Sequence, residues 1–393
     1  MGRLRPIENN AENNAVPLFL LTFFLLYGSL HLYFFLKLRA AFAPGAAVQA
    51  LVILLLILGL MAPIIVRLAE RFGLELLVHL MSWAGYLWMA VVMLFFSAGL
   101  LIDLARLLAY VGGFLFRAEI GPVLPTARTL FLVPLAVALV ISGYGFFEAR
   151  QIRTERVEIR TAKIPTAVGR IRIVQISDVH VGALVRQGRL AAILRKVREA
   201  SPDLLVATGD LVDGQLDSMD EAVAQFQAIR PRYGKFAVTG NHEFYAGLDE
   251  SIDFITRSGF VTLRGEVATV AGCLALAGVD DPTIRLARAQ GGLSDRELLS
   301  RGAGGCFAIL LKHQPIVETD APGGFDLQLS GHTHKGQIFP FSLVTGRFFR
   351  YHSGDYRFEK GALIHVSRGT GTWGPPIRFL SPPEITVIDL IPG

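Results

Sequence analysis

The sequence contains few charged residues. Asp, Glu, Lys and Arg make up only 18% of its 393 residues, whereas soluble globular chains carry about 25%. Hydrophobic residues, in contrast, account for 52% of the chain. This imbalance argues against a wholly soluble protein and predicts that part of the chain lies in lipid.

Cysteine is also scarce. Cys273 and Cys306 are far apart in the sequence, and each lies in an apolar stretch. Two such residues cannot form the dense disulfide framework of a small secreted domain. We interpret both as buried strand thiols, which carry no information about the redox compartment.

A strong excess of one charge is missing as well. The formal net charge is +5, and many of the arginines follow directly after the apolar half of the chain. That position is typical of a segment at a membrane surface, where anionic headgroups attract basic side chains. No basic face with interleaved aromatic residues is present, which argues against a nuclease, and we expect no nucleic-acid partner.

The N-terminal half contains four long apolar stretches without Asp, Glu, Lys or Arg. A bilayer-spanning helix needs about 20 residues, and the first stretch is too long for a signal peptide. We therefore predict a polar tail over residues 1–15 and an all-α transmembrane domain over residues 16–149. The four predicted spans are Val16–Leu36, Ala46–Val66, Leu76–Ile102 and Thr129–Phe147.

A fifth apolar stretch, Leu104–Phe116, is shorter and carries Arg106. We interpret it as an interfacial or buried segment, although a fifth span is an alternative. With four spans, nine basic residues lie near the membrane on the side of the C-terminal domain and five on the other. This excess predicts a multi-pass cell-membrane protein whose C-terminal domain is cytoplasmic. The nine are Arg3, Arg5, Arg67, Arg71, Arg150, Arg153, Arg156, Arg160 and Lys163, against Lys37, Arg39, Arg106, Arg117 and Arg128.

The pattern changes after Phe147, and residues 150–393 are expected to form one catalytic α/β domain. Short apolar strands alternate there with amphipathic helices such as Arg189–Ala200 and Asp220–Ile229. A first strand is expected from Arg156 onwards. Further predicted strands are Ile171–Ile176, Leu204–Ala207, Phe236–Thr239, Phe307–Leu311, Leu327–Leu329 and Ile385–Leu390.

Five clusters of polar residues follow five of these strands. In open α/β sheets, ligands bind beyond the carboxyl ends of the strands, so the clusters can converge on one site. Each motif alone is of limited specificity, but all five in this order are hard to obtain by chance. The clusters are Asp178-Val179-His180, Gly209-Asp210, Gly240-Asn241-His242-Glu243, His313, and Gly331-His332-Thr333-His334.

The side chains in these clusters suit a pair of divalent metal ions. Carboxylates, imidazoles and one amide oxygen form a mixed donor set for ions such as Mn²⁺, Fe or Zn²⁺. Two metals about 3.5–4 Å apart can hold both the attacking and the leaving oxygen of a phosphoryl displacement, with one carboxylate bridging them. We expect Gly209, Gly240 and Gly331 to allow sharp backbone turns before the ligands.

The motif set resembles the calcineurin-like metallophosphoesterase family over about residues 155–393. Three further features resemble the bacterial membrane-associated branch called YkuE-like. They are Gly278-Val279-Asp280-Asp281, Gly336-Gln337, and Arg368-Gly369-Thr370-Gly371-Thr372 running on to Pro382-Pro383-Glu384. Lys335 departs from the glycine often found there in that branch; it could add a cation near the phosphate or be solvated.

The resemblance implies a fold of two mixed β-sheets flanked by helices, and a binuclear metal centre. One metal would be held by Asp178, His180, Asp210 and His334, and the other by Asp210, Asn241, His313 and His332, with Asp210 as the bridge. The nucleophile would be a metal-bridging hydroxide. His242 would not bind metal but would stabilise the transition state or protonate the leaving oxygen. Asp213, Asp281 and Lys335 are possible supporting or substrate residues, although surface turns explain them equally well.

We therefore expect a membrane-anchored hydrolase of phosphodiester, pyrophosphate or phosphomonoester bonds. The short link to the last span and the basic segment 150–163 favour membrane lipids as partners and a lipid-linked substrate. Of the apolar residues after the last metal motif, we expect most to pack in the core and one or two to line an acyl-chain slot. These are Ile338, Phe339, Phe341, Phe348, Phe349 and Trp373.

Two alternatives stay open. A general phosphodiesterase could use its anchor only for localisation. A membrane transporter or receptor could carry a phosphoesterase-like domain that regulates it, although the predicted spans lack the paired charges typical of transport sites.

Overall fold

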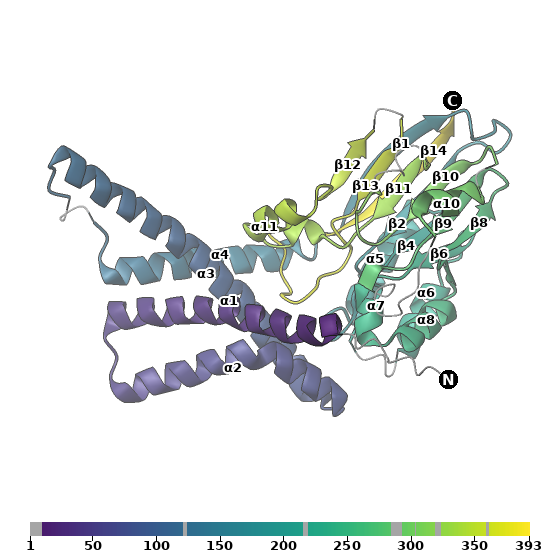
Figure 1. The fold of residues 1–393 in the computed structure, drawn as a ribbon. Coiled ribbons are helices and arrows are strands. Elements are labelled where there is room, and N and C mark those ends of the chain that lie inside the picture. Colours follow the sequence, from purple (N-terminus) through teal and green to yellow (C-terminus); the bar gives the residue numbers. More distant parts are fainter. Residues whose placement is uncertain are drawn as a thin grey trace, which may run out of the picture. The chain divides into compact units, whose positions relative to one another are not determined.

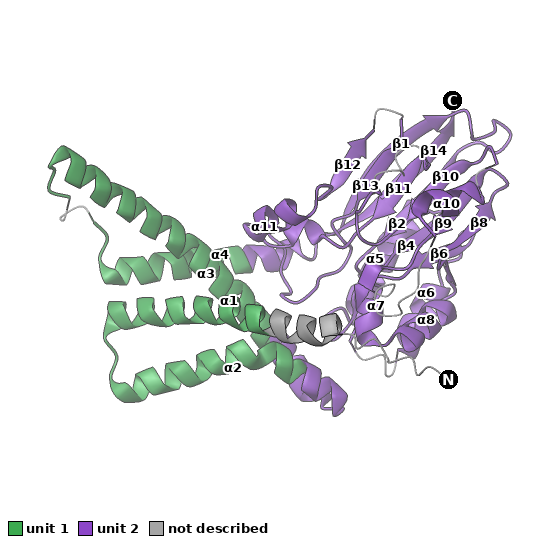
Figure 2. Ribbon diagram, viewed as in Figure 1, with its two compact units in different colours: residues 1–66, 84–142 green, residues 67–83, 143–393 purple. Residues whose placement is uncertain are grey.

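The protein divides into two compact units, which the computed structural model describes over residues 10–120, 124–214, 219–283, 293–302, 304–318, 324–358 and 361–393, with side chains from residue 21 onwards. The first unit comprises Met1–Val66 and Ala84–Ser142. The second comprises Arg67–Trp83 and Gly143–Gly393 (Figure 2). The junction of the second and third helices therefore belongs to the same unit as the α/β domain.

Four long helices occupy the N-terminal part of the chain (Figure 1). By length and composition, all four could cross a membrane. Aromatic side chains fill the interior of the first unit, where the Phe34 ring lies 4.8 Å from that of Phe95 and 5.3 Å from that of Phe131. The helices are α1 (Asn10–Phe42), α2 (Ala46–Arg71), α3 (Glu75–Phe116) and α4 (Ala127–Glu148).

The fifth apolar stretch is the end of α3, which is 42 residues long. At 1.5 Å per residue this helix is about 63 Å long, roughly twice the hydrocarbon thickness of a bilayer. Leu108 and Phe116 in this stretch are exposed. The interpretation as a buried segment is therefore wrong, because no neighbouring element covers these described side chains, and an interfacial position stays a prediction.

The α/β domain contains two six-stranded sheets in its described residues, both mixed. The first has the order β1-β14-β2-β4-β6-β7 and the second β12-β13-β11-β10-β9-β8, while β3 and β5 form a small pair. The strands of the first sheet and of the small pair are β1 (Arg153–Thr161), β2 (Ile171–Ile176), β3 (Val181–Gly182), β4 (Leu204–Thr208), β5 (Val212–Asp213), β6 (Lys235–Val238), β7 (Val261–Thr262) and β14 (Glu384–Pro392). Those of the second are β8 (Glu266–Val270), β9 (Leu274–Gly278), β10 (Phe307–Leu311), β11 (Leu327–Ser330), β12 (Gly354–Arg357) and β13 (Leu363–Val366).

The two sheets pack face to face around an apolar core, and helices cover their outer faces. Side chains of β2 and β4 meet those of β9, β10 and β11 in the central core. A second core joins the first sheet to helices α5, α6 and α8, and a third joins the second sheet to α10. The predicted fold of two mixed sheets flanked by helices is therefore confirmed. The described helices of this domain are α5 (Gln187–Ala200), α6 (Asp220–Gln227), α7 (Asn241–Ala246), α8 (Leu248–Arg257), α10 (Asp295–Ser300), η2 (His334–Gly336) and α11 (Phe341–Phe348).

The sequence pattern explains the central strands. β4 in the first sheet and β10 in the second are buried along their whole length, as expected for strands that have parallel neighbours and are covered on both faces. Helix α5 buries Leu190, Ile193 and Val197, which lie on one helical face. The strand expected from Arg156 onwards is β1, which begins at Arg153 within the basic segment 150–163 and pairs in parallel with β14.

The cysteines differ from expectation in one respect. Both are free, but only Cys273 is buried, whereas Cys306 is half-buried. They precede the paired strands β9 and β10, where Phe307 is in register with Leu274.

Candidate metal centre and active site

The first sheet contributes five of the predicted site residues. Strands β2, β4 and β6 are parallel neighbours, so their carboxyl ends lie at the same edge of the sheet. Each of the five side chains follows one of these three strands and is buried, which an ionised group tolerates only with partners. They are Asp178 and His180 after β2, Asp210 after β4, and Asn241 and His242 at the start of α7.

The second sheet contributes only imidazoles. His313 follows β10, and His332 and His334 follow β11, which pairs in parallel with β10. The Nδ1 atom of His313 lies 2.8 Å from the carbonyl oxygen of Thr208, so its Nε2 atom faces the cluster. This arrangement of a ring held by a backbone carbonyl is typical of histidines that bind metals through the other nitrogen.

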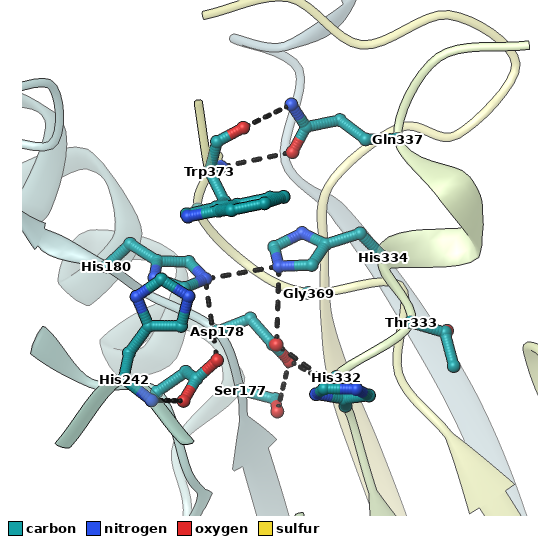
Figure 3. A network of polar contacts seen from close by, with 12 residues as sticks. Ser177, Asp178, His180, His242, His332, Thr333, His334, Gln337, Gly369 and Trp373 are labelled. Atoms are coloured by element: carbon teal, nitrogen blue, oxygen red, sulfur yellow. Dashed lines mark hydrogen bonds and ion pairs between the residues drawn. The ribbon is translucent and has the colours of Figure 1, made fainter. Parts of the chain in front are cut away.

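Side chains from both sheets meet around a first position (Figure 3). The Nε2 atoms of His180 and His334 lie 3.1 Å apart. The Nε2 atom of His334 lies 3.3 Å from Oδ1 of Asp178. These three residues offer ligand atoms that all lie within 4.8 Å of one another.

A second position lies around His313. Its Nε2 atom is 3.1 Å from Nδ1 of His332 and 3.2 Å from Oδ2 of Asp210. The same Oδ2 atom lies 3.9 Å from Nε2 of His180, which belongs to the first group. Asp210 therefore lies between the two groups, where a bridging carboxylate is needed.

The donor set fits divalent cations. The side-chain oxygen of Asn241 is buried and has no hydrogen-bond partner among the described residues. A buried polar atom without a partner is costly, and a cation would remove that cost. Together with two carboxylates and four imidazoles, this amide oxygen completes the hard-to-borderline donor set predicted from the sequence.

Both carboxylates are held in the ionised form. Burial opposes the charge of Asp178, but the imidazole of His334 outweighs it and keeps the pKa of this carboxyl below its usual range. Burial opposes the charge of Asp210 in the same way, and His313 keeps its pKa well below the ordinary value. The cluster therefore presents negative charge to a cation.

Two of the imidazoles are held neutral. Burial and the neighbouring His242 lower the pKa of His180 to about 3. Burial and the neighbouring His313 lower the pKa of His332 to about 4. Neutral imidazoles have a free lone pair, which is the form that binds a metal.

The backbone of the site is strained. Five of the seven predicted ligands have a positive φ, a conformation that residues other than glycine rarely adopt. Such strain persists where the surrounding structure fixes it, and it is concentrated at functional sites. The five are Asp178 (53°), His180 (55°), Asp210 (53°), His332 (71°) and His334 (47°).

Two of the glycines are needed for close approach rather than for sharp turns. A Cβ atom on Gly331 would lie 2.3 Å from Oδ2 of Asp178, and one on Gly240 would lie 2.1 Å from Oδ1 of Asp210. Neither glycine has a positive φ, whereas Gly209 does, at 92°. The expected role as a turn therefore holds for Gly209, and the other two make room for the carboxylates.

Glu243 supports the site and was not assigned a role from the sequence. Its buried carboxylate accepts hydrogen bonds from the backbone N–H groups of Asp210, Leu211, Val212 and Gly240, at 2.6–3.3 Å. It thereby ties the loop after β4 to the start of α7. The signal was its position at the third residue of a helix, where glutamate is typical of a capping box.

Arg378 also supports the site. Its guanidinium is fully buried, donates to the carbonyl oxygen of Arg368 at 2.7 Å and lies 3.0 Å from Nδ1 of His334. The segment around Gly371 pairs with the first ligand loop, because Gly371 N donates to the carbonyl oxygen of Asp178 at 3.0 Å. No motif in the sequence links Arg378 to this site.

His242 stands beside the cluster with its ring held from one side. Its Nδ1 atom lies 3.0 Å from Oδ1 of Asp213. Burial disfavours its charged form, but Asp210 and Asp213 outweigh burial and raise the pKa of His242. The indole of Trp373 lies beside the ring, with 5.6 Å between centroids (Figure 3).

The three remaining candidate residues, Asp213, Asp281 and Lys335, make different contacts. Asp213 contacts His242 and is therefore a supporting residue, whereas buried Asp281 accepts from the side chain of Gln314 at 3.0 Å and from Thr283 N at 2.8 Å. Lys335 has a φ of 51°, which explains why glycine is typical at this position.

This fold and this cluster define a metal-dependent phosphoesterase. Residues 171–336 match the model of the calcineurin-like phosphoesterase family. A metallophosphoesterase of Aquifex aeolicus is 37% identical over 65% of this chain and 97% of its own length. The chain therefore belongs to the calcineurin-like metallophosphoesterase family, whose members use divalent metals and act on phosphorylated substrates.

One further relative is named as a transmembrane protein. A transmembrane protein with a metallophosphoesterase domain from Danio rerio is 33% identical over 66% of this chain and 62% of its own length. The metallophosphoesterase YkuE of Bacillus subtilis is 32% identical over 63% and 90%, respectively. A solved dimetal phosphatase from Danio rerio is 14% identical over 51% of this chain and 87% of its own, with a TM-score of 0.35, too low to add to the assignment.

Proposed function

We propose that this protein is a membrane-anchored phosphoesterase with two metal ions bridged by Asp210. The observation that carries this proposal is the position of Asp210 Oδ2, 3.2 Å from His313 Nε2 and 3.9 Å from His180 Nε2. Asp178, His180 and His334 would complete one metal site, and Asn241, His313 and His332 the other. Two such ions supply charge stabilisation for a phosphoryl group and a nucleophile at neutral pH.

His242 is the residue we assign to proton transfer. Its contact with Asp213 occupies Nδ1, so Nε2 is the nitrogen available to a substrate. A raised pKa favours the protonated ring, which can donate to the leaving oxygen as its bond to phosphorus breaks. Asp213 stabilises the charged ring while it holds this proton.

The substrate we propose is a lipid-linked phosphodiester or pyrophosphate. Of the apolar residues expected to pack mostly in the core, only Ile338 is buried, so that expectation is wrong. Helix α11 has no buried residue at all, and Leu343 and Phe348 are 67% and 78% exposed. An exposed apolar helix is typical of a membrane-interaction or ligand-binding surface.

This exposed helix is joined to the metal site. Phe349, which follows α11, has its ring 5.2 Å from that of the proposed ligand His332. An acyl chain lying along α11 could therefore direct a headgroup phosphate toward the metals. Arg347 and Arg350 lie on or next to the same helix and suit anionic headgroups.

The short connection to α4 supports membrane anchoring. Only four residues separate the end of α4 at Glu148 from the start of β1 at Arg153. Fully extended, they span at most about 14 Å. Residues 67–83 and 143–393 form one unit, so both segments must lie on the same side of the membrane. A topology with four spans meets this requirement, and the proposed orientation places both segments in the cytoplasm.

The test is turnover by the full-length protein in detergent, with divalent metals added singly to a metal-free preparation. Three substrates are compared: an aryl phosphodiester, a short-chain phospholipid and a long-chain phospholipid. We expect metal-dependent hydrolysis of all three and faster hydrolysis as the chain lengthens. Equal rates across chain length would favour a general phosphodiesterase, and no hydrolysis with any metal would contradict the enzyme assignment.

Paired variants locate the lipid-binding surface. Phe348→Gln on α11 should reduce long-chain turnover and leave aryl ester turnover intact. Val261→Gln is the matched control, because Val261 is also exposed and lies on the edge strand β7.

A reporter fused at Gly393 that is active only outside the cytoplasm would contradict the proposed orientation.

One observation bears on the alternative function, a membrane transporter or receptor with a regulatory phosphoesterase-like domain. Lys37 Nζ lies 2.5 Å from Oδ1 of Asp103, which joins α1 to α3 by a charge pair not expected from the sequence. Each residue lies one position beyond the end of a predicted span: Lys37 follows Leu36, and Asp103 follows Ile102. A pair at the ends of spans fixes two helices together, whereas transport sites have charges near the middle of the bilayer.

A further inference from the structure

The end of helix α2 is part of the unit that contains the active site. Arg67–Trp83, which covers the junction of α2 and α3, groups with residues 143–393 rather than with the rest of the four helices. Arg67 is the first residue of this junction and follows directly after the predicted span. Its guanidinium reaches Asp213 in strand β5, three residues after Asp210.

Arg67 contacts two carboxylates at once. Its Nη1 atom donates to Oε2 of Glu70 at 3.0 Å, and its Nη2 atom donates to Oδ1 of Asp213 at 3.1 Å. The Asp213 carboxylate is the group that holds the ring of His242 at 3.0 Å, through the same Oδ1 atom. A continuous chain of contacts therefore runs from α2 through Asp213 to the imidazole assigned to proton transfer.

The backbone is adapted to this contact. Gly214, which follows Asp213, has a φ of 84°, and a Cβ atom there would lie 2.8 Å from Oε1 of Glu70 and 2.9 Å from Nη1 of Arg67. Two elements far apart in the sequence thus meet at Gly214, where a larger residue would displace the Arg67 and Glu70 side chains. Asp213 and Glu70 are mostly shielded, with 24% and 13% of their side chains exposed.

We propose that Arg67 is a positioning residue for the reaction, which acts on His242 through Asp213. Its Nη2 donor fixes the Asp213 carboxylate in the orientation that receives His242 Nδ1, while its Nη1 donor binds Glu70. The guanidinium also compensates the negative charge of Glu70, which would otherwise repel Asp213. The membrane helices then contribute a side chain to the catalytic apparatus as well as an anchor. This inference rests on the proposed role of His242 as the proton donor.

The test compares Arg67→Ala, Arg67→Lys and the control Arg71→Ala in the full-length protein in detergent. Arg71 is on the same helix, one turn further on, and among the described contacts Asp213 pairs with Arg67 and not with Arg71. Two phosphodiesters are used, one with a p-nitrophenyl and one with an alkyl leaving group. The alkyl leaving group needs a proton donor far more, because its oxygen leaves as a much stronger base.

We expect Arg67→Ala to lower kcat for the alkyl ester about tenfold, with KM and metal content unchanged, and to leave the aryl ester within about twofold. Arg67→Lys should recover part of the loss, and Arg71→Ala should match the wild type. In a His242→Ala background, Arg67→Ala should have no further effect on the alkyl ester. Equal losses on both esters, or an additive loss in that background, would overturn the proposal.

A structural readout separates this inference from the proposed function. A cryo-EM structure of Arg67→Ala in nanodiscs should have the His242 ring or the Asp213 carboxylate moved out of its 3.0 Å contact. An unchanged contact would overturn the inference even if no substrate were found. If wild type hydrolyses neither ester with any metal, the proposed function fails, while the change at His242 still tests the role of Arg67. A melting temperature close to that of wild type excludes general unfolding of the variant.

Discussion

The two sheets contribute different chemistry to the same site. The loops of the first sheet carry both carboxylates, the amide of Asn241 and one of the four imidazoles among the proposed ligands, while those of the second carry the other three imidazoles. Each proposed metal position takes ligands from both sheets. The proposed site is therefore complete only where the two sheets pack together.

The two sheets therefore have different roles in cation binding. The first sheet supplies the negative charge that attracts cations, so changes there should be the most damaging. The second sheet supplies imidazole ligands that fix where the cations lie. Residues that only hold the loops, such as Glu243, should affect stability more than chemistry.

The largest effect is expected from Asp210→Ala, which removes the one carboxylate that, in the described part of the chain, lies between both groups of ligands. Hydrolysis should be abolished and the content of both metals should fall, because each position loses an anionic ligand. Metal analysis by mass spectrometry and an aryl phosphodiester assay measure this. The control is Asp253→Ala, an exposed carboxylate on α8. A variant that still binds two metals would contradict the bridging role.

Removing His242 should separate chemistry from metal binding. His242→Ala should keep both metals but lose about 10²–10⁴-fold in rate, as for a general acid. The same two assays measure this change. Loss of the metals would mean that His242 is a ligand, a possibility its distance to His180 and Asp210 allows. Full activity would exclude any role in the reaction.

A smaller effect is expected from Glu243→Gln. The neutral side chain cannot accept all four backbone hydrogen bonds, and its amide hydrogens face N–H donors. We expect a loss of about 3 kcal/mol in unfolding free energy, read as a lower melting temperature of the α/β domain. The control is Glu250→Gln at an exposed position of α8. A melting temperature equal to that of wild type would show that Glu243 does not hold these loops.

The smallest effect is expected in the pH dependence of stability, through a histidine that is not among the proposed metal ligands. Burial opposes the charge of His365, but its contacts with Asp355 and Glu384 raise its pKa to about 9. A raised pKa in the folded state stabilises the protein fully below about pH 6.5, and this contribution is lost as the pH rises through about 9. We expect up to about 3 kcal/mol between these limits. A His365→Gln variant should lose this dependence, and an unchanged pH profile would contradict it.

The sequence allowed the family, the fold class and the convergence of the strand-end motifs to be predicted, because both strands and motifs are local patterns. β2 and β10 have the predicted bounds, Ile171–Ile176 and Phe307–Leu311. The contact of Arg67 with Asp213 could not be predicted, since it joins residues 146 positions apart with no shared motif. The exposure of α11 was missed for a different reason: apolar composition alone cannot distinguish a buried helix from an exposed one.

The most direct test of the account is anomalous diffraction from crystals of the full-length protein grown with Mn²⁺. We predict two anomalous peaks about 3.5–4 Å apart, one bound by Asp178, His180 and His334 and the other by Asn241, His313 and His332. Asp210 should contact both. A single peak, or two peaks of which only one contacts Asp210, would contradict the account.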